Sequence, residues 1–147
     1  MVSAAGAIIG CLIGPLLGGL FGRRPAYFVL CLSSLVICGY LFRMHDTYDM
    51  SFLFSMFLAG AATAAFYGWF PLYLPELFPT RIRATGQGVC YNFGRIFAAL
   101  GALASGKIVG VFDGDYARMG AAITLIYLLG MILIWFAPET KGRTLPK

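Results

Sequence analysis

The sequence predicts an all-α membrane protein with five transmembrane helices. Of its 147 residues, 60% are hydrophobic and 12% are charged, and the mean hydropathy is +0.83. These values lie outside the range of soluble globular domains. A helix needs about 20 apolar residues to cross a hydrocarbon core of about 30 Å, so the chain has room for about five crossings. We expect spans at residues 2–21, 26–42, 51–75, 86–112 and 119–137.

The positions of Lys and Arg predict the orientation. Cytoplasmic loops of membrane proteins are enriched in these residues, so we expect the side with more of them, including a tail at residues 138–147, to be cytoplasmic in the plasma or inner membrane. The net charge of +5 then reflects topology, and nucleic acid is not an expected partner. The expected cytoplasmic side holds Arg23, Arg24, Arg81, Arg83, Lys141, Arg143 and Lys147, whereas the other side holds Arg43 and Arg118 among Asp46, Asp49, Asp113 and Asp115.

A stripe of glycines organises the first span. Gly6, Gly10, Gly14 and Gly18 recur every four residues, which places them on one face of a helix. Small residues at this spacing let two membrane helices approach closely. We therefore interpret the stripe as a packing surface, with a lining for a substrate path as the alternative. Pro15 lies in the same span and is expected to kink it.

The second span follows a short basic turn. Gly22 to Pro25 leaves room only for a tight connection, and the proline suits the first turn of the next helix. The cysteines of the chain lie inside expected spans and form no Cys-x-x-Cys pair, so neither a metal site nor a disulfide framework is expected. No cofactor is expected either. The cysteines are Cys11, Cys31, Cys38 and Cys90.

The third span changes from small to aromatic side chains along its length. Aromatic residues at a helix end commonly belong to the interfacial belt. Tyr67 and Trp69 lie deeper than the belt requires, so they are candidates for lining a solute path. Pro71, Pro75 and Pro79 follow at intervals of four residues, and each removes a backbone donor and crowds the preceding turn. We expect the helix to loosen or stop there.

Arg95 is the most informative residue of the fourth span, for which Thr85 is an expected cap. It lies nine residues beyond Gly86, which is about 14 Å along a helix and therefore near the bilayer midplane. A charge at that depth must face protein or water, so a role in function is the default hypothesis; snorkelling to the head groups is the alternative. Tyr91 shares the helix face of Arg95, and Asn92 beside it is also a candidate for the substrate pathway.

Three segments resemble a known family. GWFPLYLPELFPTRIRATGQG, from Gly68 to Gly88, looks like the junction of the tenth and eleventh helices of the major facilitator superfamily, and PETKGR, from Pro138 to Arg143, resembles its final tail. GGLFGRRP, which starts at Gly18, is similar to the family's basic loop between the eighth and ninth helices. The branch that it resembles is that of the sugar porters and metabolite:proton symporters. On this mapping the five spans correspond to helices 8 to 12 of a twelve-helix fold, and the amino-terminal half is missing.

The resemblance implies two six-helix halves that rock around a central site. It also implies ion pairs at the cytoplasmic side that hold this side shut. Proton coupling is implied by the resemblance alone, and a proton carrier is expected in the missing half because no Asp or Glu lies deep within the spans. The residues that match the cytoplasmic gate of the family are Arg23, Arg24, Glu76, Arg81, Arg83 and Glu139.

Two departures from the family pattern bear on the substrate. The basic loop lacks the usual aspartate before its arginines, which weakens the expected clamp on the neighbouring helix. Pro71 stands where sugar porters commonly carry a tryptophan, five residues before Glu76. An organic anion, which Arg95 would suit, is therefore at least as good a candidate as a sugar.

These observations lead to two hypotheses of different classes. The first is the carboxyl-terminal part of a secondary transporter for a small polar metabolite, a fragment that is inactive unless the missing half or a partner supplying it is present. The second is a non-transporting membrane protein that associates with another transporter through its glycine-lined first helix. A membrane enzyme is a distant third, because no cluster of catalytic residues is evident and the lone His45 lies in an outer loop beside Asp46.

Overall fold

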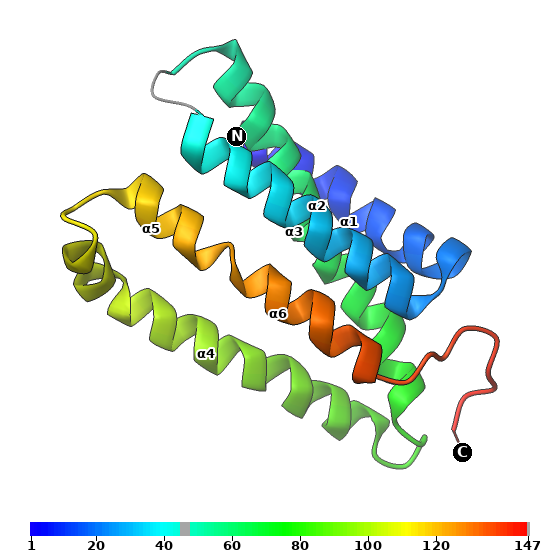
Figure 1. Cartoon of the computed structure of the whole chain (residues 1–147). Helices are drawn as coiled ribbons and strands as arrows, with labels where there is room; N and C mark the ends of the chain where they lie inside the picture. The colour runs from blue at the N-terminus through cyan, green and yellow to red at the C-terminus, as the bar shows by residue number, and fades with distance from the viewer. Residues whose placement is uncertain (45–47, 147) are drawn as a thin grey trace.

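The computed structural model describes residues 1–44 and 48–146, and it is all-helical over these ranges (Figure 1). His45, Asp46 and Lys147 lie outside the described residues. Five segments of the described chain are long and apolar enough to cross a membrane. They are α1 (Val2–Phe21), α2 (Arg23–Met44), α3 (Met50–Leu77), α4 (Arg83–Val111) and the segment Tyr116–Phe136, which comprises α5 (Tyr116–Ile123), α6 (Ile126–Leu133) and a short 3-10 helix (Ile134–Phe136).

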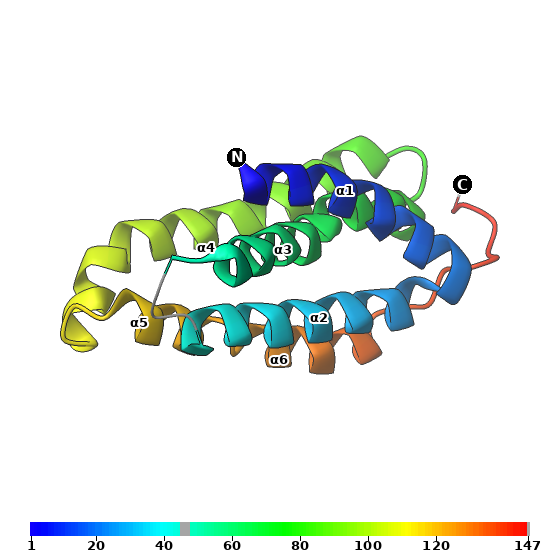
Figure 2. The same cartoon turned by 90° about the horizontal axis from the view of Figure 1, so that it is seen from above.

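Helix α3 is the centre of the bundle. It packs against α1 on one side and α2 on the other, and α2 in turn contacts α5 and α6 (Figure 2). The contact between α1 and α3 is the most extensive in the described chain. Helix α4 lies alongside the bundle and has no buried side chain, since its contacts with the rest of the described chain are sparse and lie mainly with α3 and α5.

The glycine stripe of α1 makes the contact with α3. A Cβ added at Gly6, Gly10 or Gly14 would lie 2.0–2.1 Å from a backbone carbonyl oxygen of α3. The two backbones therefore touch directly, in the arrangement where Cα–H groups point at carbonyl oxygens of the partner helix. Gly18 continues the stripe against the side chains of Leu72 and Trp69.

Helix α3 runs through two of its three prolines. Pro71 and Pro75 lie inside the helix, which ends at Leu77. As expected, the helix does not continue through all three prolines, although it ends two residues later than the expected span. A membrane helix tolerates proline where neighbouring helices or a local adjustment of the helix satisfy the backbone groups that the proline frees. It ends before Pro79 because a proline disfavours the helical conformation of the preceding residue, and Phe78 is indeed extended, with φ −117° and ψ 137°.

Several helix boundaries differ by one to three residues from the expected ones, and the final span is interrupted. Helix α2 begins at Arg23, three residues earlier than expected, and α4 begins at Arg83, ahead of Thr85, with Ile82 in the capping position. The final span is broken near its middle, where the backbone N–H groups of Leu125 and Leu128 donate to the carbonyls of Ala122 and Leu125, three residues earlier, at 3.2 and 3.0 Å. These bonds tighten the chain into a 3-10 turn between α5 and α6.

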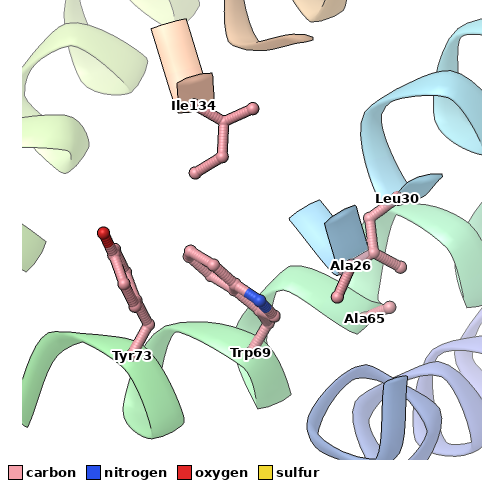
Figure 3. Packing of buried hydrophobic residues seen from close by; sticks show 6 residues of the cluster. All are labelled: Ala26, Leu30, Ala65, Trp69, Tyr73 and Ile134. Atoms are coloured by element: carbon pink, nitrogen blue, oxygen red, sulfur yellow. The ribbon is translucent and has the colours of Figure 1, made fainter. Parts of the chain in front are cut away.

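The buried core lies where α2, α3 and the end of the final span meet. Figure 3 shows Trp69 of α3 between Tyr73 of the same helix and Ala26 and Leu30 of α2, with Ile134 of the final span facing them. The rings of Trp69 and Tyr73 are 4.7 Å apart. This core holds the chain's end against α2 and α3, and so positions the tail that follows.

Candidate functional site

A cavity of about 680 Å³ lies between α4 and the layer formed by α2, α3 and α6. We call it the central cavity. Its size suits a small organic molecule. Its lining from the described chain is mainly aromatic and aliphatic, with Arg95 as the single charged side chain and with no Asn, Gln, Asp or Glu.

Three of the five expected pathway residues border this cavity. Tyr67 reaches it from α3, and Tyr91 and Arg95 reach it from α4. Trp69 does not, since its side chain is only 1% exposed and lies in the core. Asn92 is also absent from the lining, and its amide donates to the carbonyl of Gly88 at 2.8 Å on its own helix.

Aromatic rings from three helices form the wall opposite α4. Tyr27 of α2 meets Phe66 of α3 edge to face, with ring centroids 5.2 Å apart. Phe66 stacks on Tyr127 of α6 at 6.1 Å, with only 10° between the ring planes. Phe70 continues the wall one helical turn further along α3. Sequence reasoning missed Phe66 and Tyr127, because their apposition depends on how α3 and α6 pack and no local pattern indicates it.

Arg95 lies close to the middle of its helix. It follows the first residue of α4 by twelve positions, which is about 18 Å of helix length. Its guanidinium lies 5.9 Å from the ring centroid of Tyr91, within the range of a cation–π interaction. The face of α4 that carries both residues also carries Gly94 and Ala98, and the cavity extends along this face.

A second group of polar residues joins the α1–α2 turn, the end of α3 and the carboxyl-terminal tail. Arg23 forms a two-pronged ion pair with Glu76, in which its Nε lies 2.8 Å from one carboxylate oxygen. The hydroxyl of Thr140 donates to the same carboxylate, and Arg23 also donates to the carbonyl of Gly18 at 3.0 Å. We call Arg23, Arg24, Glu76, Glu139 and Thr140 the charged cluster.

Glu139 caps the amino terminus of α2. Its carboxylate accepts the backbone N–H groups of Arg23 at 2.9 Å and Arg24 at 3.0 Å, which are donors that a helix leaves without intrahelical partners. This contact explains why α2 begins at Arg23. Gly22 has φ +103°, and a Cβ there would lie 3.2 Å from the Glu139 carboxylate, so the close approach favours glycine.

The environment of Glu139 favours its charged form. Burial of the carboxylate opposes ionisation, but the N–H groups of Arg23, Arg24, Lys141 and Thr140 outweigh it and hold the pKa of Glu139 below its usual range. The start of the tail is therefore held against the α1–α2 turn through Glu139. Tyr73 adds a further link, since its hydroxyl donates to the carbonyl of Pro138 at 2.7 Å.

The structure brings together four of the six residues expected in the gate. Arg24 joins Arg23, Glu76 and Glu139 through a bond from its Nε to the carbonyl of Ala137. Arg83 instead donates to backbone carbonyls of Phe78 and Pro146, and Arg81 is exposed. Thr140 was not expected in the gate, although it belongs to the PETKGR segment that resembles the final tail of the family.

The chain resembles known transporters over nearly its whole length. It is 28% identical to a provisionally named metabolite transport protein of Haemophilus influenzae, over 98% of this chain and 35% of that protein. It is 29% identical to the cis,cis-muconate transport protein of Acinetobacter baylyi and 28% identical to a provisionally named 4-methylmuconolactone transporter of Cupriavidus pinatubonensis, over 91% and 96% of this chain and 32% of each relative. The chain thus spans about a third of the length of the curated relatives that it matches.

A profile of the family described as sugar (and other) transporter matches residues 1–145. The chain belongs to the sugar (and other) transporter family. This confirms the resemblance to the major facilitator superfamily that the sequence motifs indicated. As a member, the chain is an integral membrane protein of a transporter family, not an enzyme.

Proposed function

We propose that this chain is the carboxyl-terminal part of a secondary transporter that moves a small polar metabolite, a sugar or an organic anion, by alternating access. The observation that carries the proposal is the central cavity, because it places Tyr67, Tyr91 and Arg95 around a space near the middle of the spans. Transporters of this architecture bind substrate at that depth. Two relatives are named as carriers of cis,cis-muconate and 4-methylmuconolactone, which supports an organic metabolite.

The five spans match helices 8 to 12 of the twelve-helix fold in this proposal. The motif positions support that mapping, and the match to only about a third of each relative agrees with it. Alternating access requires two halves that move around one site, so we expect the chain alone to be inactive. A missing amino-terminal half, or a partner supplying it, completes the path.

The charged cluster is proposed as part of a cytoplasmic gate. It ties the α1–α2 turn, the end of α3 and the tail together through Arg23, Glu76 and Glu139. Such bonds are individually weak at a wet surface, but they are sufficient to shift the balance between two conformations of similar energy. The positive-inside rule supports a cytoplasmic location of this end in the plasma or inner membrane.

The second hypothesis requires the glycine face of α1 to bind another transporter, but this face is covered in the structure. The glycines of α1 that it requires face α3 of the same chain at backbone contact. A partner could reach them only by displacing α3. We therefore retain the transporter fragment as the proposed function.

The test begins with the native transcript upstream of the Met1 codon, where we expect about seven further apolar spans in the same frame. The full product is then reconstituted into proteoliposomes, and uptake of labelled glucose and benzoate is measured with and without a proton gradient. The 147-residue chain alone serves as the inactive control. Absence of uptake by the full product, or equal uptake by the chain alone, would contradict the proposal.

A further inference from the structure

We propose that Thr124 holds a joint with two settings in the final span, which lets α5 turn while α6 keeps its place. We call residues 122–128, which lie between the two helices (Figure 1), the joint. In the setting of this structure the joint is a 3-10 turn, and the hydroxyl of Thr124 holds it. In the other setting it is a continuous α-helix, and α5 has turned away from α2. The role of the joint in transport rests on the proposed function, whereas the joint itself does not.

An exchange of hydrogen-bond donors at the carbonyl of Ala121 forms the joint. In an α-helix this carbonyl accepts the N–H of Leu125, four residues later. Here the N–H of Leu125 donates to Ala122 at 3.2 Å, and the carbonyl of Ala121 accepts the hydroxyl of Thr124 at 2.7 Å. Thr124 and Leu125 have ψ angles of −20° and −16°, as is typical of a 3-10 turn. The hydroxyl therefore replaces the backbone donor that the turn redirects.

Both settings satisfy the polar groups at this carbonyl. Thr124 is buried, and an unpaired carbonyl beside it would be costly inside a membrane. When the N–H of Leu125 returns to Ala121, the hydroxyl of Thr124 can bond the carbonyl four residues earlier. Thr63 makes a bond of this kind at 2.7 Å inside the intact helix α3. The settings therefore differ in geometry more than in hydrogen bonding, as two conformations of similar energy do.

The 3-10 turn places two glycines of the final span on the same face. A Cβ added at Gly120 of α5 would lie 2.7 Å from the ring of Phe42, and one at Gly130 of α6 would lie 3.1 Å from the sulfur of Cys31. Both of these neighbours belong to α2. Ten residues of α-helix turn through about 1000°, which is about 80° short of three full turns. A 3-10 turn advances about 120° per residue in place of about 100°, so about four such residues supply the difference.

The rise along the chain agrees with this count. Cys31 and Phe42 are eleven residues apart, which is about 16.5 Å along α2 and close to three full turns. On the final span, about six α-helical residues and about four 3-10 residues rise about 17 Å. Ten α-helical residues would rise only about 15 Å. The joint therefore matches the final span to α2 in both rotation and length.

Helix α5 is the half of the final span that can turn. Helix α6 is fixed on two sides, by Gly130 against α2 and by the stack of Tyr127 on Phe66 of α3. Helix α5 has 8 residues, and its contacts within the described ranges lie mainly with α2 and α4. A return to α-helix turns α5 by about 80° and carries Gly120 off Phe42. The movement reaches the outer end of α4 through the short turn that joins it to α5.

The experiment cross-links cysteine pairs in the 147-residue chain, held in lipid nanodiscs and oxidised with copper phenanthroline. The α5 pair combines Gly120→Cys with Phe42→Cys and reports whether α5 lies on α2. The α6 pair combines Gly130→Cys with the native Cys31 and reports the place of α6. Mass spectrometry identifies and quantifies the linked peptides. Both pairs should form in the parent chain, and absence of the α5 pair there would overturn the packing of Gly120 on Phe42.

Variants of Thr124 then test the hydroxyl. Thr124→Val keeps the shape but removes the hydroxyl, so it should favour the α-helical setting. We expect the rate of the α5 pair to fall about five- to tenfold, the effect of one buried hydrogen bond, and the α6 pair to stay unchanged. Thr124→Ser keeps the hydroxyl and should restore the α5 pair. Thr63→Val is the matched control, because it removes a hydroxyl from an intact helix, and it should change neither pair.

The outcomes separate the joint from the proposed transport function. An α5 pair that forms equally in Thr124→Val overturns the joint, and so does a loss of both pairs, since α5 and α6 then move as one helix. In the full product that carries the α5 pair, oxidation should stop uptake and reduction should restore it. Uptake that persists with α5 locked overturns the moving joint and leaves the proposed function in place. Absence of uptake by the unmodified full product counts against the proposed function, and the cross-linking result still decides the joint.

Discussion

The contact between α1 and α3 makes a sharp prediction for Gly10. A Cβ at this position would lie 2.0 Å from the carbonyl oxygen of Ala61, where ordinary contacts begin near 3.4 Å. Because the obstacle is helix backbone, no side chain can rotate to make room. Gly10→Ala therefore forces the two helices apart by about 1 Å or more, which also opens the neighbouring contacts at Gly6 and Gly14. Overpacking of this kind costs about 1–3 kcal/mol.

The matched control is Gly19→Ala on the same helix, since a Cβ there meets nothing within 4 Å. Stability is measured by titrating SDS into mixed micelles and following the fluorescence of Trp69, which packs beside Gly18 in this interface, in a Trp135→Phe background. We expect Gly10→Ala to unfold at clearly lower SDS than Gly19→Ala. Identical unfolding of the two variants would refute the backbone contact between α1 and α3.

Three further predictions concern the charged cluster and the central cavity. Glu76→Gln leaves the guanidinium of Arg23 without its counter-charge and should destabilise the chain by about 1–3 kcal/mol, whereas Arg81→Gln should change the same unfolding curve little. The pKa of Glu139 is lowered in the folded chain, so its contribution to stability is present above the ordinary pKa of 4.5 and disappears as the pH falls through the lowered pKa. The difference in thermal stability between wild type and Glu139→Gln should therefore vanish in acid. A difference that does not depend on pH would contradict this. A water-soluble maleimide should label Cys90, which is exposed and borders the cavity, well before the buried Cys38, and mass spectrometry showing Cys90 unlabelled would argue against a water-accessible cavity.

The sequence predicted the general architecture well because its strongest signals are local. Long apolar segments and the glycine spacing of α1 follow from composition and from the helical period, so five candidate spans and a close helix contact could be expected without coordinates. The prolines located the end of α3 only to within a few residues. The proline rule describes the cost in water, whereas a membrane helix tolerates proline where its surroundings satisfy the freed backbone groups, and Pro71 and Pro75 lie inside α3.

The sites were only partly predictable, because they depend on which faces of distant helices meet. Depth in the span singled out both Tyr67 and Trp69, but it could not distinguish the side of α3 that borders the cavity from the side that enters the core. Likewise, neither proline nor glycine marks the break at Thr124. Its hydroxyl bonds to the backbone in a way that serine and threonine adopt in many intact helices.

By itself, the sequence determined the membrane class, the family and the position of Arg95 along its helix, since these depend on composition, motif spacing and the constant rise of a helix. Only the tertiary structure decided what each of these residues faces. It placed the α1 glycines on α3, Trp69 in the core, and Glu139 on the first N–H groups of α2, more than a hundred residues away in the chain. The physical reason is that burial, charge pairing and capping depend on neighbours in space, which a local pattern does not specify.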